Sequence, residues 1–406
     1  MLTPEELSDR LVAAIDTERL IGLVQQVCRI PSVLGEEGEL AGFLRDTMRE
    51  SGFEATALQP VLPDRPNALG ELSFAAGKRV VLTGHMDTKP VSHGWSATTP
   101  YSGDLIDGNV YGHGIMDMKA ALVCQIVAME ALRGSGLDLA GTVAMAAVSD
   151  HMGDQLGSIA YFDSYPADLA VLGELSDNEI FLGHRGRYYF DITVLGTSAH
   201  TCHKHRAVNA NALAAQAILE LDASAYTPDL DGWVRDLFGD ETFMAPGRVY
   251  GGLAPGGPSM IPDECVIRVD CRPQPGVTTD QVRDEIDRCL ERAHERDPRF
   301  RAEVTLADVK DGYLADPDDT VVTNIRDAVR AVRKSRGSAR DAEPALQAAG
   351  WLGDTASFGA KVPTVIFGPG GEPVYCADEH LSVEDIIEAT QVYATFAAIV
   401  LSGSAE

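Results

Sequence analysis

The chain has 406 residues, 45% of them hydrophobic and 23% charged, which is enough to build two domains with buried cores. Its formal net charge of −28 makes nucleic acid and anionic membranes poor partners for the surface as a whole. The sequence contains no apolar run of about 18 residues, so we expect no transmembrane helix, and its N-terminus resembles a helix start rather than a signal peptide.

The seven cysteines are scattered along the chain, their number is odd, and none forms a Cys-x-x-Cys pair. This pattern argues against a disulfide framework or a structural zinc knuckle. It favours buried thiols in a reducing compartment, and we therefore expect a cytoplasmic protein.

In the first part of the chain, helical and strand-like patterns alternate. Helices are predicted at residues 5–28, as one or two amphipathic segments, at about 36–51, and at 117–132. Short apolar runs at residues 79–84, 142–148 and 169–173 predict buried strands. Strands that alternate with helices indicate an α/β layer with a mostly parallel sheet.

The pattern changes after residue 183. Residues 187–194 alternate with a period of two, and they are followed by a helix at 208–221, a strand at 266–272, a helix at 279–296 and a strand at 301–305. This order suggests an inserted α+β domain of the βαββαβ kind, after which a strand at 362–367 and a helix at 382–401 resume the first sheet. We therefore expect a catalytic domain of residues 1–183 and 303–406, split by an inserted lid domain of residues 184–302.

Polar residues follow the ends of the predicted buried strands. The segment Gly84-His-Met-Asp87 ends one strand, and Gly112-His-Gly-Ile-Met-Asp117-Met-Lys119 precedes a helix. Glu174 follows the strand at residues 169–173. A histidine with carboxylates at strand ends is suited to first-row metal chemistry with zinc, cobalt or manganese.

This ordered set of motifs resembles the M20 family of zinc peptidases and amidohydrolases across nearly the whole chain. That family includes aminoacylases, carboxypeptidase G, acetylornithine deacetylase and succinyl-diaminopimelate desuccinylase. The resemblance implies that His85, Asp117 and Glu174 hold one divalent metal, zinc before cobalt or manganese, and that Asp87 orients the His85 imidazole. A metal-free state remains an alternative.

Three positions depart from the family pattern. The family has a general base and a ligand of a second metal where this chain has His151 and Met152, and a histidine ligand where it has Tyr375. A neutral histidine can replace a base near neutral pH, but a thioether is a poor ligand for a borderline dication. We therefore expect a one-metal or metal-free site with His151 and Tyr375 as acid and base. A register shift that makes Asp150 the base and His151 a ligand remains open.

Other positions that match the family pattern concern substrate binding and catalysis. The resemblance implies that His200, from the partner subunit of a homodimer formed through the lid, stabilises an oxyanion. It also implies substrate-facing positions at Arg272, Arg185, Asn209, Ser259 and Gly370. Arg272 would hold a substrate carboxylate by a bidentate pair.

These observations favour an amide-bond hydrolase that acts on an N-acyl amino acid or a small peptide-like compound. A second hypothesis drops hydrolysis and assigns acyl transfer, condensation, cyclisation or elimination in a biosynthetic pathway to the altered site. A third hypothesis is a non-catalytic binding protein, although the retained set His85, Asp117, Glu174 and His200 argues against it.

Overall fold

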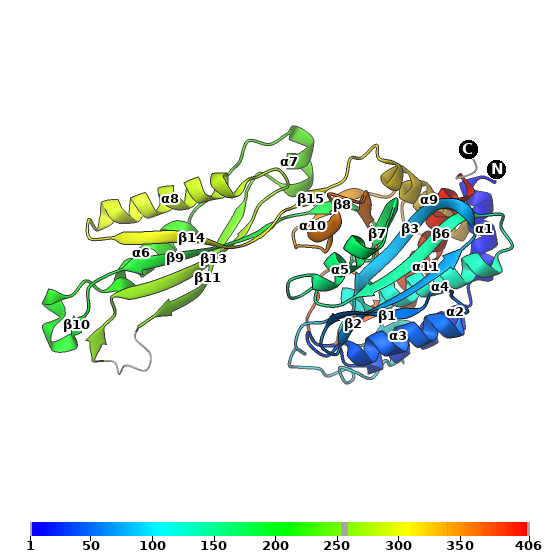
Figure 1. Ribbon diagram of the computed structural model, residues 1–406, viewed down its shortest axis with the longest axis horizontal. Coiled ribbons are helices and arrows are strands. Elements are labelled where there is room, and N and C mark those ends of the chain that lie inside the picture. The colour runs from blue at the N-terminus through cyan, green and yellow to red at the C-terminus, as the bar shows by residue number, and fades with distance from the viewer. Residues whose placement is uncertain (1, 253–258, 339, 404–406) are drawn as a thin grey trace. The chain divides into compact units, whose positions relative to one another are not determined.

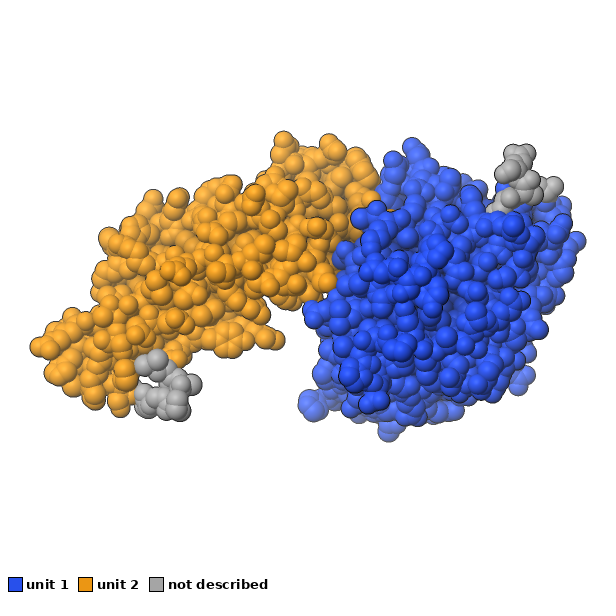
Figure 2. Space-filling view, in the orientation of Figure 1, with its two compact units in different colours: residues 1–183, 315–347, 353–406 blue, residues 184–314, 348–352 orange. Residues whose placement is uncertain are grey.

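The structure is a computed structural model that describes residues 2–252, 259–338 and 340–403 (Figure 1). The chain divides into two compact units (Figure 2). The first unit contains Met1–Gly183, Ala315–Gln347 and Gly353–Glu406, and the second contains His184–Leu314 and Ala348–Leu352.

Helices and strands alternate through most of the first unit. Its helices are α1 (Pro4–Ala14), α2 (Thr17–Arg29), α3 (Gly38–Glu50), α4 (Ala120–Gly134), α5 (Leu156–Ser164), α9 (Thr320–Arg336), α10 (Thr355–Phe358) and α11 (Val383–Ser402). Its main strands are β1 (Ala57–Leu62), β2 (Arg65–Ser73), β3 (Ala75–His85), β6 (Ala140–Val148), β7 (Leu169–Leu172) and β17 (Thr364–Ile366). A small separate sheet contains β4 (Leu105–Ile106), β5 (Asn109–Tyr111) and β18 (His380–Ser382).

The large sheet of the first unit has the order β1-β2-β6-β3-β7-β17 and continues to β8 (Ile180–His184), which pairs antiparallel with β17. Strand β3 pairs in parallel with both β6 and β7, and β7 pairs in parallel with β17. Strands β1 and β2 add an antiparallel edge. Because β6, β3 and β7 are adjacent and parallel, their carboxyl ends meet at one edge of the sheet, where α/β proteins commonly bind ligands.

Helices pack on both faces of this sheet (Figure 1). Helices α4 and α11 contact β3 and β6. On the other face, Ala144 and Ala146 of β6 share a buried cluster with Tyr161 and Phe162 of α5. Since successive residues of a strand point to opposite faces, both sides of β6 are apolar, and this explains its uninterrupted apolar run.

The second unit is an α+β unit with its own core. Strands β11 (Phe243–Gly251), β13 (Glu264–Arg272), β9 (Arg187–Leu195) and β14 (Arg301–Lys310) form, in that order, an antiparallel sheet. Helices α6 (Ala210–Asp222) and α8 (Thr279–Arg296) supply Leu213 and Ile286 to its buried cluster. Further elements are α7 (Gly232–Phe238), a short 3-10 helix (Thr201–Arg206) and the short strands β10 (Ala199–His200), β12 (Met260–Ile261) and β15 (Tyr313–Leu314).

The α/β fold class predicted from the sequence is confirmed, with a large mixed sheet in the first unit and a βαββαβ order in the second. The predicted division ended the inserted domain at residue 302. In the structure β14 spans that position and pairs with β9, so the second unit continues to Leu314. The elements β1, β2, α5, α7, β11 and α9 were not predicted.

Helix α11 is the only described helix that is long and apolar enough, by length and composition, to cross a membrane. Its apolar window is 78% buried, and it packs against α4 and α9. This is the environment of a core helix, and it explains the apolar sequence of α11 without a membrane.

Candidate active site

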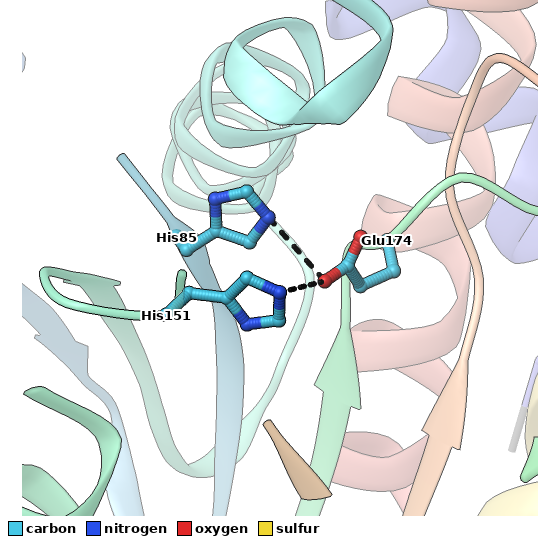
Figure 3. Close-up of side chains that lie close together, drawn as sticks. All are labelled: His85, His151 and Glu174. Carbon is cyan, nitrogen blue, oxygen red and sulfur yellow. Dashed lines mark ion pairs between the residues drawn. The ribbon is translucent and has the colours of Figure 1, made fainter. Parts of the chain in front are cut away.

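The site lies where three neighbouring parallel strands of the first unit end. His85 is the last residue of β3, His151 lies in the loop after β6, and Glu174 follows β7 by two residues. Figure 3 shows the two imidazole rings with a nitrogen of each turned toward the same Glu174 oxygen. Asp117 joins them from the irregular turn Ile115–Lys119 that leads into α4.

Three buried donor atoms converge at this point. His85 Nε2 lies 2.9 Å from Asp117 Oδ1 and 3.4 Å from Glu174 Oε1. All three side chains are 5% exposed or less. None of the three atoms makes a well-aligned hydrogen bond within the described chain, and they face one another at ion-pair distance. Because buried polar atoms are nearly always satisfied, such a group of atoms marks a place for a cation or a reacting ligand.

The protonation of these groups reflects their proximity. Burial alone would lower the pKa of His85, but the Glu174 and Asp117 carboxylates outweigh it and hold that pKa well above its ordinary value. Burial also acts to raise the pKa of Asp117, yet the neighbouring His85 charge and the Tyr375 hydrogen bond lower it. Burial raises the pKa of Glu174. The group therefore favours a bound positive charge.

The donor set fits the divalent metal that was predicted. One imidazole nitrogen and two carboxylate oxygens, all buried and close together, are ligands that zinc, cobalt and manganese accept. Ligand atoms of His85, His151 and Glu174 also lie within 4.8 Å of one another. The residues that would hold the ion are thus His85, Asp117 and Glu174, with His151 beside them.

His151 is fixed at both of its ends. Its main-chain N–H donates to Asp87 Oδ1 at 3.0 Å, and its Nδ1 lies 2.8 Å from Asp354 Oδ1. Its Nε2 lies 3.8 Å from Glu174 Oε1. The His151 ring stacks on the His85 ring, with centroids 4.1 Å apart and planes inclined by 9°.

Asp87 has a different role from the one expected of its carboxylate. Its main-chain carbonyl, and not its side chain, lies 2.9 Å from His85 Nδ1. The carboxylate instead accepts the main-chain N–H groups of His151 and Met152, the latter at 2.7 Å. The orientation of His85 is therefore set by the backbone, while the carboxylate holds the turn that carries His151.

Tyr375 reaches the site from the first unit's C-terminal segment. Its hydroxyl donates to Asp117 Oδ2, the oxygen that does not face His85. Burial and the nearby Asp117 charge raise the pKa of Tyr375, so its phenol stays protonated and acts as a donor. Both oxygens of Asp117 are thereby directed to different partners.

Asp150 does not face these groups. Its carboxylate pairs with Arg65 at 2.8 Å and accepts the main-chain N–H of Asp154 at 3.1 Å. Arg65 also pairs with Glu37 at 2.6 Å. These contacts are those of a residue that shapes the turn, and they argue against the alternative in which Asp150 is the base.

Two expected substrate contacts are engaged inside the second unit. Arg185 is 2% exposed and donates to the main-chain carbonyls of Glu241, Arg272 and Phe238. These contacts favour a structural role for Arg185 over the predicted contact with substrate. The Arg272 guanidinium already forms a bidentate pair with Asp270, at 2.8 and 2.9 Å.

The other predicted positions have clear local surroundings. His200 is exposed, and its Nδ1 accepts the main-chain N–H of Cys202 at 3.2 Å. The Asn209 side chain caps the start of α6. The Ser259 carbonyl accepts the N–H of Thr201. Gly370 has a positive φ of 87°, and its carbonyl accepts the N–H of Asp177.

Two residues beside the site were not predicted as site residues. Asp354 is fully buried against His151, and Ser158 Oγ donates to Asp354 Oδ2 at 2.8 Å. In the sequence, an aspartate before a short helix does not indicate a site residue. The role of Asp354 becomes visible only from its contact with His151.

Comparisons with known proteins agree with this geometry. Residues 81–398 match the model of peptidase family M20/M25/M40. The chain is 30% identical over 392 residues to succinyl-diaminopimelate desuccinylase from Methylorubrum extorquens strain PA1, covering 92% of this chain and 96% of that protein. A desuccinylase from Gluconacetobacter diazotrophicus is 26% identical over 387 residues, covering 92% of this chain and 95% of that protein.

Solved structures share the fold. The M20 family metallo-carboxypeptidase from Sulfolobus solfataricus has a TM-score of 0.76 at 17% identity, over 94% of this chain and 99% of its own. Aminopeptidase PepT from Bacillus cereus has a TM-score of 0.75 at 19% identity, over 95% of this chain and 99% of its own. The chain therefore belongs to peptidase family M20/M25/M40 and is an enzyme of the amidohydrolase and peptidase type.

Proposed function

We propose that the enzyme hydrolyses the amide bond of an N-acyl amino acid or a small peptide-like compound at a site with one divalent metal. The observation that carries this proposal is the set of three buried donor atoms from His85, Asp117 and Glu174, which no hydrogen bond within the described chain satisfies. Zinc is the expected ion, and cobalt or manganese are the alternatives.

Each residue has a defined task in this proposal. A bound divalent ion supplies Lewis acidity toward the scissile carbonyl. His151 Nε2 accepts a proton from the attacking water, and the same proton later reaches the leaving nitrogen. Tyr375 holds Asp117 in place by its hydroxyl. Arg272 would exchange its Asp270 partner for a substrate carboxylate, a competition that requires a substrate with a free carboxylate group.

An N-succinyl amino acid is the substrate to test first. The relatives that are 24–30% identical to this chain are named succinyl-diaminopimelate desuccinylases. Because the base and second-metal positions carry His151, Met152 and Tyr375 in this chain, the acyl group and the amino acid stay open within the proposed class.

We also infer a homodimer in which His200 of a second copy stabilises the oxyanion. His200 is exposed and makes no ion pair within the described chain. Large apolar side chains are exposed on the same unit, among them Leu219 of α6, Tyr250 of β11 and Met260 of β12, with exposed fractions of 61%, 56% and 46%. Analytical ultracentrifugation of the full chain checks this, and a monomer at assay concentrations that is fully active would contradict it.

The cytoplasm is the proposed location. All seven cysteines are free, and Cys28, Cys124, Cys265, Cys271 and Cys289 are buried. Free thiols of this number are typical of a reducing compartment.

Metal analysis combined with an amide-hydrolysis assay tests the function. The wild-type chain should bind about one zinc per subunit after loading and desalting, and release amine from N-succinyl-diaminopimelate or from N-acetyl amino acids. His85→Ala should lose both the metal and the activity, whereas His205→Ala, at an exposed histidine of the second unit, should keep both. Full hydrolysis by a metal-free chain would contradict the proposal.

A second function is favoured by one observation. Tyr375 donates to Asp117 and stands where the family has a histidine, and His151 stands where the family has its general base, so the site offers a phenol and an imidazole for proton transfer. Such a pair could catalyse acyl transfer or another non-hydrolytic reaction. Product analysis in the presence of an added amine separates the two functions, because transfer gives a new amide and hydrolysis gives the free acid.

A further inference from the structure

The most distinctive contact of the site joins two residues that are 203 positions apart in the chain. His151 Nδ1 lies 2.8 Å from Asp354 Oδ1. The Asp354 residue is fully buried, while the His151 side chain keeps 11% of its surface exposed. The Asp354 carboxylate therefore meets the imidazole from inside the protein, while part of the imidazole stays exposed.

The aspartate is itself held from two directions. Ser158 Oγ, at the start of α5, donates to Asp354 Oδ2 at 2.8 Å. Gln155 Nε2 donates to the carbonyl of Gly353, the preceding residue, at 3.1 Å. These contacts leave Asp354 Oδ1 free to accept from His151, and they fix its position before any substrate binds.

The stacking of the two rings separates the expected tasks of His85 and His151. The lone pair of an imidazole nitrogen lies in the plane of its ring, so a ligated metal lies near that plane. The two rings are stacked with nearly parallel planes and centroids 4.1 Å apart. His85, Asp117 and Glu174 would hold the ion, and His151, stacked beside His85, would be left for proton transfer.

We propose that Asp354, supported by Ser158, is a positioning residue that holds His151 with its proton on Nδ1 and its Nε2 free to accept a proton. This inference rests on the proposed hydrolysis. The water oxygen bonds to the carbonyl carbon as its proton moves to His151 Nε2. That proton is then transferred to the nitrogen as the C–N bond breaks, so the acid and the amine account for all atoms.

The Asp354→Asn substitution gives a sharp test because it is isosteric. The asparagine oxygen can still accept from Ser158, which turns the amide NH₂ group toward His151 Nδ1. Nδ1 must then accept, and the proton moves to Nε2, where it blocks the base. An exchange of this kind in a serine protease lowers kcat by about 10⁴-fold, and we expect a loss of about 10³- to 10⁴-fold here.

Nitrogen NMR of the ¹⁵N-histidine-labelled full chain, with and without zinc, reads the tautomer without any need for activity. The signals that disappear in His151→Gln are assigned to His151. The wild type should carry the proton on Nδ1, and Asp354→Asn should carry it on Nε2, with unchanged zinc content by elemental analysis. Ser158→Ala should keep the wild-type tautomer and lose about 10-fold in kcat. Asp163→Asn, at an exposed aspartate of α5, serves as the matched control.

Two outcomes would overturn the proposal. One is an Nε2-protonated His151 in the wild type. The other is a parallel loss of zinc and activity in Asp354→Asn, which would make His151 a metal ligand. If the wild type cleaves neither N-succinyl-diaminopimelate nor N-acetyl amino acids, the proposed function fails while the tautomer measurement still decides the role of Asp354.

Discussion

The partners of the two Asp117 oxygens bear on how many metal ions this site can bind. One of its oxygens faces His85 Nε2, and the other accepts the Tyr375 hydroxyl. A carboxylate that bridges two metals needs both oxygens for ions. The phenol occupies the second oxygen, and the thioether of Met152 is a poor ligand for such an ion, which supports the proposed single-metal site.

Restoring acidic and imidazole ligands should therefore create a second binding position. The double variant Met152→Glu with Tyr375→His should raise the zinc content from about one to about two per subunit, because both replacements are good zinc ligands. Elemental analysis after loading and desalting measures the change.

The single variant Tyr375→Phe is the control for this experiment. It removes the hydrogen bond to Asp117 and adds no ligand, so it should keep about one zinc per subunit. A double variant with no additional metal would show that Met152 and Tyr375 do not flank a second metal position.

The secondary-structure elements position these side chains with little freedom. His85, His151 and Glu174 follow the ends of β3, β6 and β7, which are adjacent and parallel. In the same unit, a buried ion pair joins helices α9 and α11. Arg333 of α9 is 1% exposed and pairs with Glu388 of α11 at 3.0 Å. Arg333 also pairs with Glu179 at 2.8 Å.

Removing this arginine should destabilise the first unit strongly. Arg333→Met leaves Glu388 buried with its closest cationic partner gone, and we expect a loss of about 3–5 kcal/mol in the free energy of unfolding. Arg330→Met on the same helix breaks an exposed pair with Glu343 and should cost less than about 1 kcal/mol. Urea denaturation of both variants measures the two losses. Equal losses would mean that the buried Arg333 pair contributes no more to the free energy of unfolding than the exposed Arg330 pair.

The molecule as a whole has two units, each with its own apolar core. Most cysteines lie inside these cores, where burial raises the pKa of Cys28, Cys124 and Cys271 to about 12. Cys202 alone among the described cysteines is exposed. The thiols therefore report on the integrity of both units.

Thiol labelling of the native chain should follow this division. At pH 8, Cys202 should react rapidly with a disulfide reagent, whereas Cys28, Cys124 and Cys271 should react only after denaturation, because a buried neutral thiol is a poor nucleophile. Mass spectrometry of labelled peptides checks the order. Rapid labelling of Cys124 in the native chain would contradict the burial described here.

The same pKa values predict the direction of a pH effect on stability. Above the ordinary thiol pKa of 9.0, unfolded chains lose these protons while the folded state keeps them up to about 12. The unfolded state then binds fewer protons, so the free energy of unfolding should fall as the pH rises from 9 toward 12. Comparing unfolding in urea at pH 8 and pH 10 for the wild type and Cys124→Ala isolates the contribution of one thiol.

Periodicity in the sequence predicted much of the fold. The apolar runs of β3, β6 and β7 and the amphipathic patterns of α2 and α8 are local signals, because burial of one or both faces selects for them. Strand β11 was missed because Pro246 and Gly247 interrupt its pattern, and the structure accommodates them with a register shift. Helix α9 was missed even though Val322, Ile325 and Val329 have helical spacing.

Parallel pairing of β3 and β7 brings together His85 and Glu174, whereas Asp117 reaches them from the turn that precedes α4. From its order of motifs, the sequence predicted the family and the α/β fold. It could not show that Arg185 is engaged by main-chain carbonyls, that Asp150 faces Arg65, or that Asp354 holds His151. Those contacts join segments far apart in the chain, and folding alone brings their side chains within hydrogen-bond distance. The chemical role of His151 depends on such a contact, since the partner of one ring nitrogen determines what the other can do.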